Sequence, residues 1–268
     1  MLTYDFFSFE SPNGDCKRCA KVCYNMVSVG LFVAWIMNVC GIDCSVHREG
    51  FRFIAIGLAV SLLFAFFSTS LAWLGFLLTA FCAFFFRNPK RAVPSDANLI
   101  VSPADGKVTA ITLETPPQEL GLGEEKRYRV SVFLSILNVH INRMPIGGKI
   151  KNIIYQPGSF LNASLDKASV FNEKNTLIIE INEQLENLLG ISQIAGVIAR
   201  RIVCEAHEGQ QVSKGEVFGL IRFGSRCDVW LPVGVVPQVI LGQTAVAGET
   251  VFADMSQKEG VLREGTEI

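Results

Sequence analysis

The stretch from residue 53 to residue 86 contains no charged side chain and reads FIAIGLAVSLLFAFFSTSLAWLGFLLTAFCAFFF. About 20 apolar residues cross a bilayer, so the stretch is too long for one span and just long enough for two short ones. Three polar residues, Ser68, Thr69 and Ser70, fall in its middle, where a helical hairpin would turn. The sequence therefore predicts a membrane helical hairpin over residues 51–88, with arms of about fifteen residues that cross a thin bilayer or dip into one leaflet.

Basic residues flank this stretch on both sides: Arg48 and Arg52 precede it, and Arg87, Lys90 and Arg91 follow it. Because positive residues mark the cytoplasmic side of a membrane segment, both ends of the hairpin are expected in the cytoplasm. We therefore expect a protein of the cell (inner) membrane whose following domain lies on the cytoplasmic face. A pair of buried core helices is the alternative, disfavoured because core helices rarely run so far without a charge.

Residues 1–50 are predicted to be an N-terminal extension, and they carry five of the eight cysteines. Only Cys204 and Cys227 lie in the soluble region, so a reducing compartment is predicted rather than a disulfide framework. The sequence CKRCAKVC contains a C-x-x-C, but no second pair or histidine follows at zinc-finger spacing, so no metal site is predicted. The apolar segment 26–40 is open between a membrane span, an interfacial segment and a signal-like start.

Residues 89–268 have the composition of a soluble domain. Its apolar runs are short, β-branched and bounded by turns, as in RYRVSVFLSI, NTLIIEIN and EVFGLIRFG. Such runs, separated by Gly and Pro, are typical of a sandwich or barrel, and the one clear helical window is 164–174. We predict a mostly β fold, a β-sandwich or barrel domain with few helices, preceded by the hydrophobic hairpin. The net charge of −1 offers nucleic acid no attraction, so that partner is excluded.

Three residues are candidates for chemistry. His140 ends the apolar run in VFLSILNVHINRMP, where its ring would be held in place, although a hydrogen-bonded structural histidine is the alternative. Asp105 lies in the turn sequence SPADGKV, where most such aspartates only cap the backbone. Ser225 follows Gly224 in RFGSRCD, and no G-x-S-x-G of a hydrolase surrounds it.

A glycine before a serine has one specific chemical use. It leaves the preceding carbonyl uncrowded, so that the serine hydroxyl can attack it and convert the peptide bond into an ester. Elimination from that ester would cut the chain and leave dehydroalanine, which becomes a pyruvoyl group. Gly224 and Ser225 are candidates for this chemistry, with an inert turn as the alternative, since Gly-Ser is a common dipeptide.

Two similar segments, residues 102–112 and 207–225, support a different interpretation. Each places Gly and Lys before a strand, in the manner of a lipoyl hairpin, which would make the chain a membrane-anchored carrier or binding module. Neither Lys107 nor Lys214 has the D-K-A or M-K-M surroundings of a lipoyl or biotinyl site. The carrier is therefore the more distant hypothesis, and a structural membrane protein with an inert Gly-Ser turn is more distant still.

Several segments together resemble the short, membrane-associated class of phosphatidylserine decarboxylases, including archaetidylserine decarboxylase-like members. They are FFRNPKR after the hydrophobic stretch, VSPADGKV, FLSILNVHINRMPIGGKI, YQPGSFLNASLDKASVFNEKN, QIAGVIARRIVC and GEVFGLIRFGSRCDVWLP. The resemblance runs in order from residue 50 to residue 237, and residues 1–45 lie outside it.

The resemblance implies a pyruvoyl-dependent carboxy-lyase that converts phosphatidylserine in the membrane to phosphatidylethanolamine and carbon dioxide. The chain would cleave itself after Gly224 into fragments 1–224 and 225–268, which would remain associated. The pyruvoyl group derived from Ser225 would be the covalent cofactor, without a metal, and would form a Schiff base with the substrate amine. An archaetidylserine substrate with ether-linked chains is the alternative, and a homo-oligomer is left open.

The same resemblance implies a triad in which His140 is the base, Asp105 orients it and Ser225 is the nucleophile. His140 would also reprotonate carbon after decarboxylation. Longer family members have two histidines in the segment matching NVHINRMP, whereas here Arg143 stands near the second position. One histidine would then serve both steps, or Arg143 would contribute. Longer members also have Gly-Ser-Thr where Arg226 follows the serine here.

Overall fold

The computed structural model describes residues 44–158, 172–181, 187–196, 201–222 and 224–257. The N-terminal cysteine pair, the apolar segment 26–40 and most of the helix predicted at 164–174 lie outside the described residues. The chain divides into two compact units, Met1–Phe84 and Phe85–Ile268.

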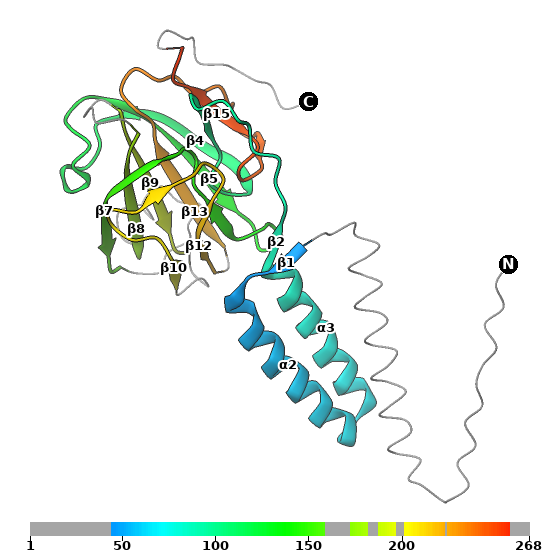
Figure 1. Ribbon diagram of the computed structural model, residues 1–268. Helices are drawn as coiled ribbons and strands as arrows, with labels where there is room; N and C mark the ends of the chain where they lie inside the picture. The colour runs from blue at the N-terminus through cyan, green and yellow to red at the C-terminus, as the bar shows by residue number, and fades with distance from the viewer. Residues whose placement is uncertain (1–43, 159–171, 182–186, 197–200, 223, 258–268) are drawn as a thin grey trace, which may run out of the picture. The chain divides into compact units, whose positions relative to one another are not determined.

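The first unit contains β1 (Cys44–Val46) and two apolar helices, α2 (Arg48–Phe67) and α3 (Thr69–Phe85) (Figure 1). Phe85, the last residue of α3, belongs to the second unit. The chain breaks between the helices at Ser68, which is extended at φ −152° and ψ 124°. The hairpin and its turn are thus as predicted, but the arms have 20 and 17 residues rather than about fifteen.

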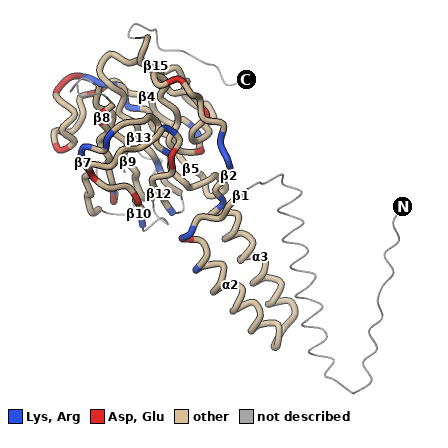
Figure 2. The backbone as a smooth tube through the Cα atoms, viewed as in Figure 1, with Lys and Arg blue, Asp and Glu red and all other residues tan. Residues whose placement is uncertain are grey.

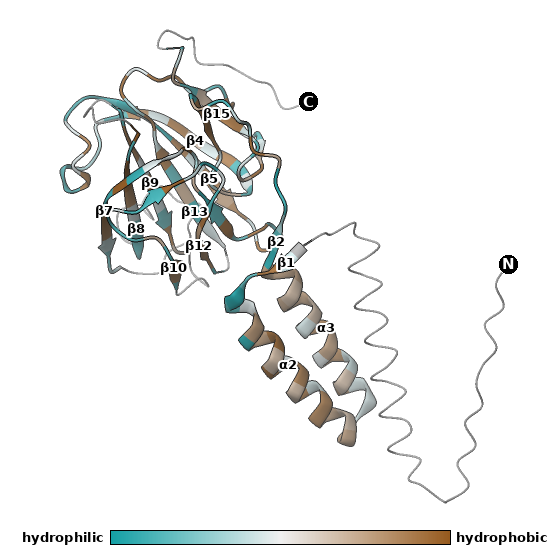
Figure 3. Ribbon diagram, viewed as in Figure 1, coloured by the Kyte–Doolittle hydropathy of each residue, from teal (hydrophilic) through white to brown (hydrophobic). Residues whose placement is uncertain are grey.

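The hairpin is apolar along most of its length (Figure 3), and its charges lie only in the first turns of α2 (Figure 2). By length and composition, α2 is able to cross a membrane, and α3 is a shorter apolar helix.

Two glycines set the distance between the helices. A Cβ atom at Gly57 would lie 2.5 Å from the Thr79 hydroxyl oxygen, and a Cβ atom at Gly75 would lie 2.5 Å from the Ser61 hydroxyl oxygen. Both hydroxyls instead donate to carbonyls one turn earlier in their own helices, Ser61 to Gly57 at 2.6 Å and Thr79 to Gly75 at 2.8 Å. Glycine on one helix therefore faces a small hydroxyl residue on the other, which allows close packing of the kind common between membrane helices.

The second unit is built almost wholly from strands. They are β2 (Arg87–Pro89), β3 (Leu99–Val101), β4 (Gly106–Glu114), β5 (Arg127–Leu134), β6 (Ile141–Arg143), β7 (Gly148–Gln156), β8 (Lys174–Glu180), β9 (Leu188–Ile194), β10 (Ile202–Cys204), β11 (Gln211–Val212), β12 (Val217–Ile221), β13 (Ser225–Trp230), β14 (Thr244–Ala245) and β15 (Val251–Asp254), with a short 3₁₀ turn at Gln118–Leu120. The prediction of a mostly β domain with few helices, preceded by an apolar helical hairpin, is confirmed.

Three antiparallel sheets make up the domain within the described residues. The largest has the order β11-β7-β8-β9-β13-β5-β4-β14, a second has the order β10-β12-β6, and the third pairs β15 with β3 (Figure 1). The main apolar core includes residues from both larger sheets, among them Val132, Ile191, Phe218 and Val229. Because side chains alternate along a strand, each strand of the largest sheet gives one face to this core.

Strand β13 lies in the middle of the largest sheet, paired with β5 on one side and β9 on the other. All six of its residues are buried. Cys227 and Val229 belong to the main core, and Asp228 and Trp230 project from the opposite face. Ser225 alternates with Cys227 and Val229, so its side chain is on the core face of the sheet.

Candidate active site

Two neighbouring crossovers connect the two larger sheets. Strand β5 ends at Leu134, and the chain enters the other sheet at Ile141 in β6. It returns from β12 to β13, where Ser225 is paired with Leu134. At the other end, the Ile221 amide donates to the His140 carbonyl at 3.2 Å. Ser225 and His140 therefore stand at opposite ends of two adjacent connections.

Ser225 is completely buried, and its hydroxyl has no hydrogen-bond partner among the described residues. The residue before it, Gly224, has φ +60°, in the left-handed region that favours glycine. A Cβ atom at Gly224 would meet no heavy atom within 4 Å, so the space beside this residue is open. A buried hydroxyl without a partner is uncommon, because burial removes its bonds to water.

His140 is 1% exposed and held by two contacts. Its Nδ1 lies 2.9 Å from the Asn138 carbonyl oxygen, and the Phe85 ring lies 4.2 Å from the imidazole, centroid to centroid. A carbonyl can only accept, so Nδ1 carries the hydrogen and Nε2 carries the lone pair. Nε2 is buried and has no partner among the described residues. The ring thus presents an unoccupied acceptor.

The surroundings of His140 keep its ring neutral. Burial lowers the pKa of His140 from 6.5 to about 4, the bond to Asn138 opposes this, and the positive charge of Arg87 lowers the pKa further. At neutral pH the imidazole is uncharged, and its Nε2 is free to accept a proton.

Asp105 lies beside the opposite end of β6. Its carboxylate accepts hydrogen bonds from Arg91 Nη2 at 2.7 Å and from the Ala247 amide at 2.8 Å. The carbonyl of Pro103 accepts from the Arg143 amide at 2.9 Å, which places this turn next to Arg143. The side chains of Asp105 and His140 are therefore not hydrogen-bonded to each other in this structure. The Asn138 carbonyl holds the imidazole here, and the orienting role of Asp105 stays a prediction.

The Arg143 guanidinium is hydrogen-bonded to backbone and side-chain oxygens. Its guanidinium donates to the Gly215 carbonyl at 2.9 Å, to Asn88 Oδ1 at 2.6 Å and to the Pro89 carbonyl at 3.0 Å. Burial and the charge of Arg91 lower the pKa of Arg143, and the carboxylates of Asp105 and Glu249 oppose this. These contacts join β6 to the segment that follows the hairpin.

The other two histidines have different surroundings. His47 caps the start of α2, where its Nδ1 accepts from the Glu49 amide at 3.4 Å. His207 is an exposed turn residue. Within the described ranges, no group of three or more His, Cys, Asp and Glu side chains could hold a metal ion.

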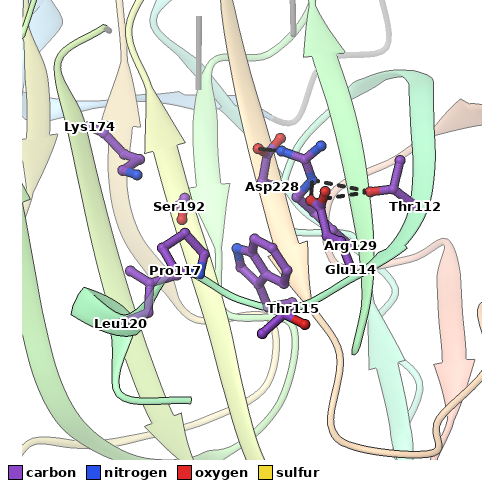
Figure 4. A pocket seen from close by; sticks show the side chains of 10 residues that line it. Thr112, Glu114, Thr115, Pro117, Leu120, Arg129, Lys174, Ser192 and Asp228 are labelled. Carbon is purple, nitrogen blue, oxygen red and sulfur yellow. Dashed lines mark hydrogen bonds and ion pairs between the residues drawn. The ribbon is translucent and has the colours of Figure 1, made fainter. Parts of the chain in front are cut away.

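A pocket of about 440 Å³ opens on the other face of β13 (Figure 4). Arg129 joins its walls: its guanidinium lies 2.8 Å from the Glu114 carboxylate, 3.6 Å from the Asp228 carboxylate and 5.6 Å from the centre of the Trp230 ring. Because Asp228 and Trp230 face away from the core, this pocket is separated from Ser225 by the sheet itself.

Buried charges hold β13 in place next to this pocket. Arg226 donates to both carboxylate oxygens of Asp228, at 2.8 Å and 3.0 Å, and both side chains are 3% exposed. Such a paired arrangement satisfies charges that would be costly to bury alone. Arg226, which departs from the Gly-Ser-Thr of longer family members, therefore has a structural role in the strand that begins at Ser225.

Three further residues near the site, Asn138, Asn142 and Gln193, were not identified from the sequence. Asn138 holds His140 through its backbone carbonyl, and Asn142 bonds to Gln193, which is 51 positions away in the chain. The two-residue spacing between His140 and Asn142 was the only sequence signal that could have pointed to Asn142.

A sequence profile of the phosphatidylserine decarboxylase family matches residues 78–253 of this chain. The matched region begins within α3 and ends in β15, so it contains Asp105, His140 and Ser225. The match covers more than half of the sequence. The chain therefore belongs to the phosphatidylserine decarboxylase family.

Proposed function

We propose that the chain is a phosphatidylserine decarboxylase that makes its own pyruvoyl group from Ser225. The observation that carries this proposal is the Ser225 hydroxyl, which is buried without a partner directly after a glycine at φ +60°. Membership of a decarboxylase family supports the reaction class.

The residues present fit such a group. The space beside Gly224 is open, so the carbonyl that Ser225 would attack is not crowded by a side chain. The lone pair of His140 Nε2 has no other partner among the described residues and is available to a nearby proton. A pyruvoyl group is also smaller than serine with its amine, so it needs no additional space.

The proposed cleavage begins when Ser225 Oγ gives its proton to His140 Nε2 and bonds to the carbonyl carbon of Gly224. The bond from that carbon to the Ser225 nitrogen breaks, and the nitrogen takes a proton, which leaves an ester. A base then removes the α-proton of residue 225 while the Cβ–O bond breaks and releases the Gly224 carboxylate. Water replaces the nitrogen, which leaves as ammonia, and residue 225 becomes pyruvoyl.

The pyruvoyl carbonyl supplies a reactive site for the substrate amine and an electron sink for the pair left by carbon dioxide. His140 is the residue we expect to deliver the proton that replaces the lost carboxylate. The apolar helix α2 and the phospholipid family together indicate membrane association. We propose that the domain lies on the cytoplasmic face of the inner membrane, where phosphatidylserine presents its head group.

Fragments 1–224 and 225–268 are expected to remain together after cleavage. Strand β13, at the start of the smaller fragment, is hydrogen-bonded to β5 and β9 of the larger one. The ion pair between Arg129 and Asp228 also joins the fragments, because Arg129 belongs to the larger one and Asp228 to the smaller.

The carrier hypothesis finds less support. A lipoyl or biotinyl lysine must swing freely at a hairpin tip, but the Lys214 ammonium is bonded to the backbone carbonyls of Asp96 and Leu99. Lys107 lies within β4, paired with residues of β5 and β14, and not at a hairpin tip.

Decarboxylation of phosphatidylserine in detergent micelles tests the function. The wild-type chain should release carbon dioxide and form phosphatidylethanolamine, and Ser225→Ala should do neither. Parallel assays with ester-linked and ether-linked serine lipids distinguish phosphatidylserine from archaetidylserine. A wild-type chain that is cleaved but inactive on both lipids would contradict the proposed substrate class.

A further inference from the structure

Three polar atoms on almost fully buried side chains near the β12–β13 connection have no hydrogen-bond partner within the described parts of the chain. They are Ser225 Oγ, His140 Nε2 and the side-chain nitrogen Nδ2 of Asn142. All three side chains are almost fully buried, at 0%, 1% and 0% exposure. Ser225 Oγ and His140 Nε2 are the nucleophile and the base of the proposed cleavage, whereas Asn142 Nδ2 takes part in none of its proton transfers.

The Asn142 side chain is held by a chain of buried amides. Asn175 Nδ2 donates to Gln193 Oε1 at 3.1 Å, and Gln193 Nε2 donates to Asn142 Oδ1 at 2.9 Å. Each amide in this hydrogen-bonded row polarises the next, and the last donor, Asn142 Nδ2, is left unused. The hydrogen bonds fix the orientation of that donor before any reaction takes place.

The strand register places this donor near Ser225. Gln193 is directly opposite Cys227 in the β9–β13 pair, so both side chains are on the same face. Ser225 is two residues along β13 on that face, the position of a diagonal neighbour, which long side chains reach. Asn142 contacts Gln193 and lies two residues after His140, which immediately precedes β6. Asn142 therefore links His140, two residues before it, with Ser225, the diagonal neighbour of its hydrogen-bond partner Gln193.

A buried N–H donor without a partner destabilises the folded chain, so its retention requires an explanation. The proposed cleavage supplies one. When Ser225 Oγ bonds to the Gly224 carbonyl carbon, the carbonyl oxygen becomes negatively charged next to the buried Ser225 side chain. Such an oxygen needs a fixed donor, and a donor that is unused in the ground state stabilises the transition state selectively.

We propose that Asn142 is a catalytic residue of self-cleavage, whose side-chain N–H donates to the Gly224 oxygen as that oxygen becomes negative. Gln193 is its positioning residue. This inference rests on the proposed function, because it requires Ser225 to attack Gly224. His140 takes the Ser225 proton, and Asn142 carries no proton transfer.

The test follows conversion of the newly translated full-length chain into its two fragments by gel. Removal of one donor to such an oxygen slows a reaction roughly 100-fold or more. Asn142→Leu, which matches the side chain in size without a donor, and Asn142→Asp, which replaces the donor with an acceptor, should each show this loss. Thr176→Val is the matched control, because it removes one buried hydrogen bond, to Ser192 at 2.8 Å, between β8 and β9, the strands that contain Asn175 and Gln193. It should cleave at the wild-type rate.

Gln193→Glu tests the orientation of the amide without a change in size. A carboxylate at this position accepts but cannot donate, so the Asn142 amide should turn its N–H towards residue 193 and away from Gly224. Cleavage should then slow as in Asn142→Leu. Wild-type cleavage in Gln193→Glu would overturn the proposed orientation.

Hydroxylamine separates the first step from the later ones, because it cuts an ester that has already formed. It should not speed cleavage of Asn142→Leu, since that variant is slow before the ester. Rapid hydroxylamine cleavage of Asn142→Leu would show that Asn142 acts later and would overturn the proposal. Wild-type cleavage in Asn142→Leu would overturn it while leaving the proposed function intact. An uncleaved wild-type chain would instead contradict the proposed function itself.

Discussion

The neutral imidazole of His140 predicts an unusual pH dependence of self-cleavage. The ring is 1% exposed, lies 4.2 Å from the Phe85 ring and is near the positive charge of Arg87, and its pKa is lowered to about 4. At pH 5.5 such a base is about 97% neutral, whereas a histidine with the ordinary pKa of 6.5 is about 9% neutral. If His140 Nε2 takes the Ser225 proton, the cleavage rate should be nearly the same at pH 5.5 and pH 7.5.

The assay measures the rate of fragment formation by the full-length chain between pH 4 and pH 8. The rate should fall with a midpoint near pH 4, and Arg87→Gln should move that midpoint upward because it removes a charge that lowers the pKa of His140. A roughly tenfold loss of rate between pH 7.5 and pH 5.5 would refute the assignment of the base to this buried ring.

The same pKa affects stability in a defined direction. The folded chain keeps His140 neutral, whereas the unfolded chain binds a proton below pH 6.5. This contribution is therefore fully present above pH 6.5 and is lost as the pH falls towards 4, by roughly 3 kcal/mol in all. Denaturant unfolding of uncleaved Ser225→Ala should show the loss, and Ser225→Ala/His140→Asn should show a smaller one.

Three further predictions concern stability and assembly. Asp228→Ala leaves the buried Arg226 guanidinium without its carboxylate and should lower the free energy of unfolding by about 3–5 kcal/mol. As a control, Glu114→Gln changes a carboxylate that is 41% exposed and should lower the free energy of unfolding by less than about 1 kcal/mol. Equal losses in the two variants would contradict this prediction. Gly75→Leu forces a side chain against Ser61 and should destabilise the hairpin by about 1–3 kcal/mol, which would lower the thermal unfolding midpoint in detergent. Leu77→Ala, at an exposed position of the same helix, should change that midpoint little. After cleavage, an affinity tag on fragment 225–268 should retain the larger fragment in buffer and release it only in denaturant, because β13 is paired on both sides; a tagged fragment that elutes alone would contradict this.

The hairpin was predictable because it depends on a property of consecutive residues. A run without charges and a central polar cluster located the turn, and the chain does break at Ser68. The arms were predicted too short because the charge-free run was taken as the helix. Arg48 and Arg52 lie inside α2, since a helix end requires only a cap, here His47, and charged side chains extend into water.

The β domain was predictable as a class, because short β-branched runs between turns favour strands, but the order of its strands was not. The pairing of β5 with β13, which places Ser225 opposite Leu134, joins segments far apart in the chain. Single-sequence patterns contain no information about such pairs.

The candidate site was predictable only as a set of residues. His140 and Ser225 were found from residue chemistry and the family resemblance, and both are buried at adjacent crossovers. The partner of His140 is a backbone carbonyl, which any residue type supplies, so sequence could not identify Asn138. The ion pair between Asp105 and Arg91 was equally hidden, because the approach of two oppositely charged residues depends on the fold.

Mass spectrometry of the purified full-length protein tests self-processing at Ser225 most directly. We predict two polypeptides, one ending at Gly224 and one beginning at residue 225. The smaller should have the mass expected when the amine and hydroxyl of an N-terminal serine are replaced by one keto oxygen, and Ser225→Ala should give a single intact chain. An active wild-type enzyme with the intact mass, or a smaller fragment with an ordinary N-terminal serine, would contradict the proposal.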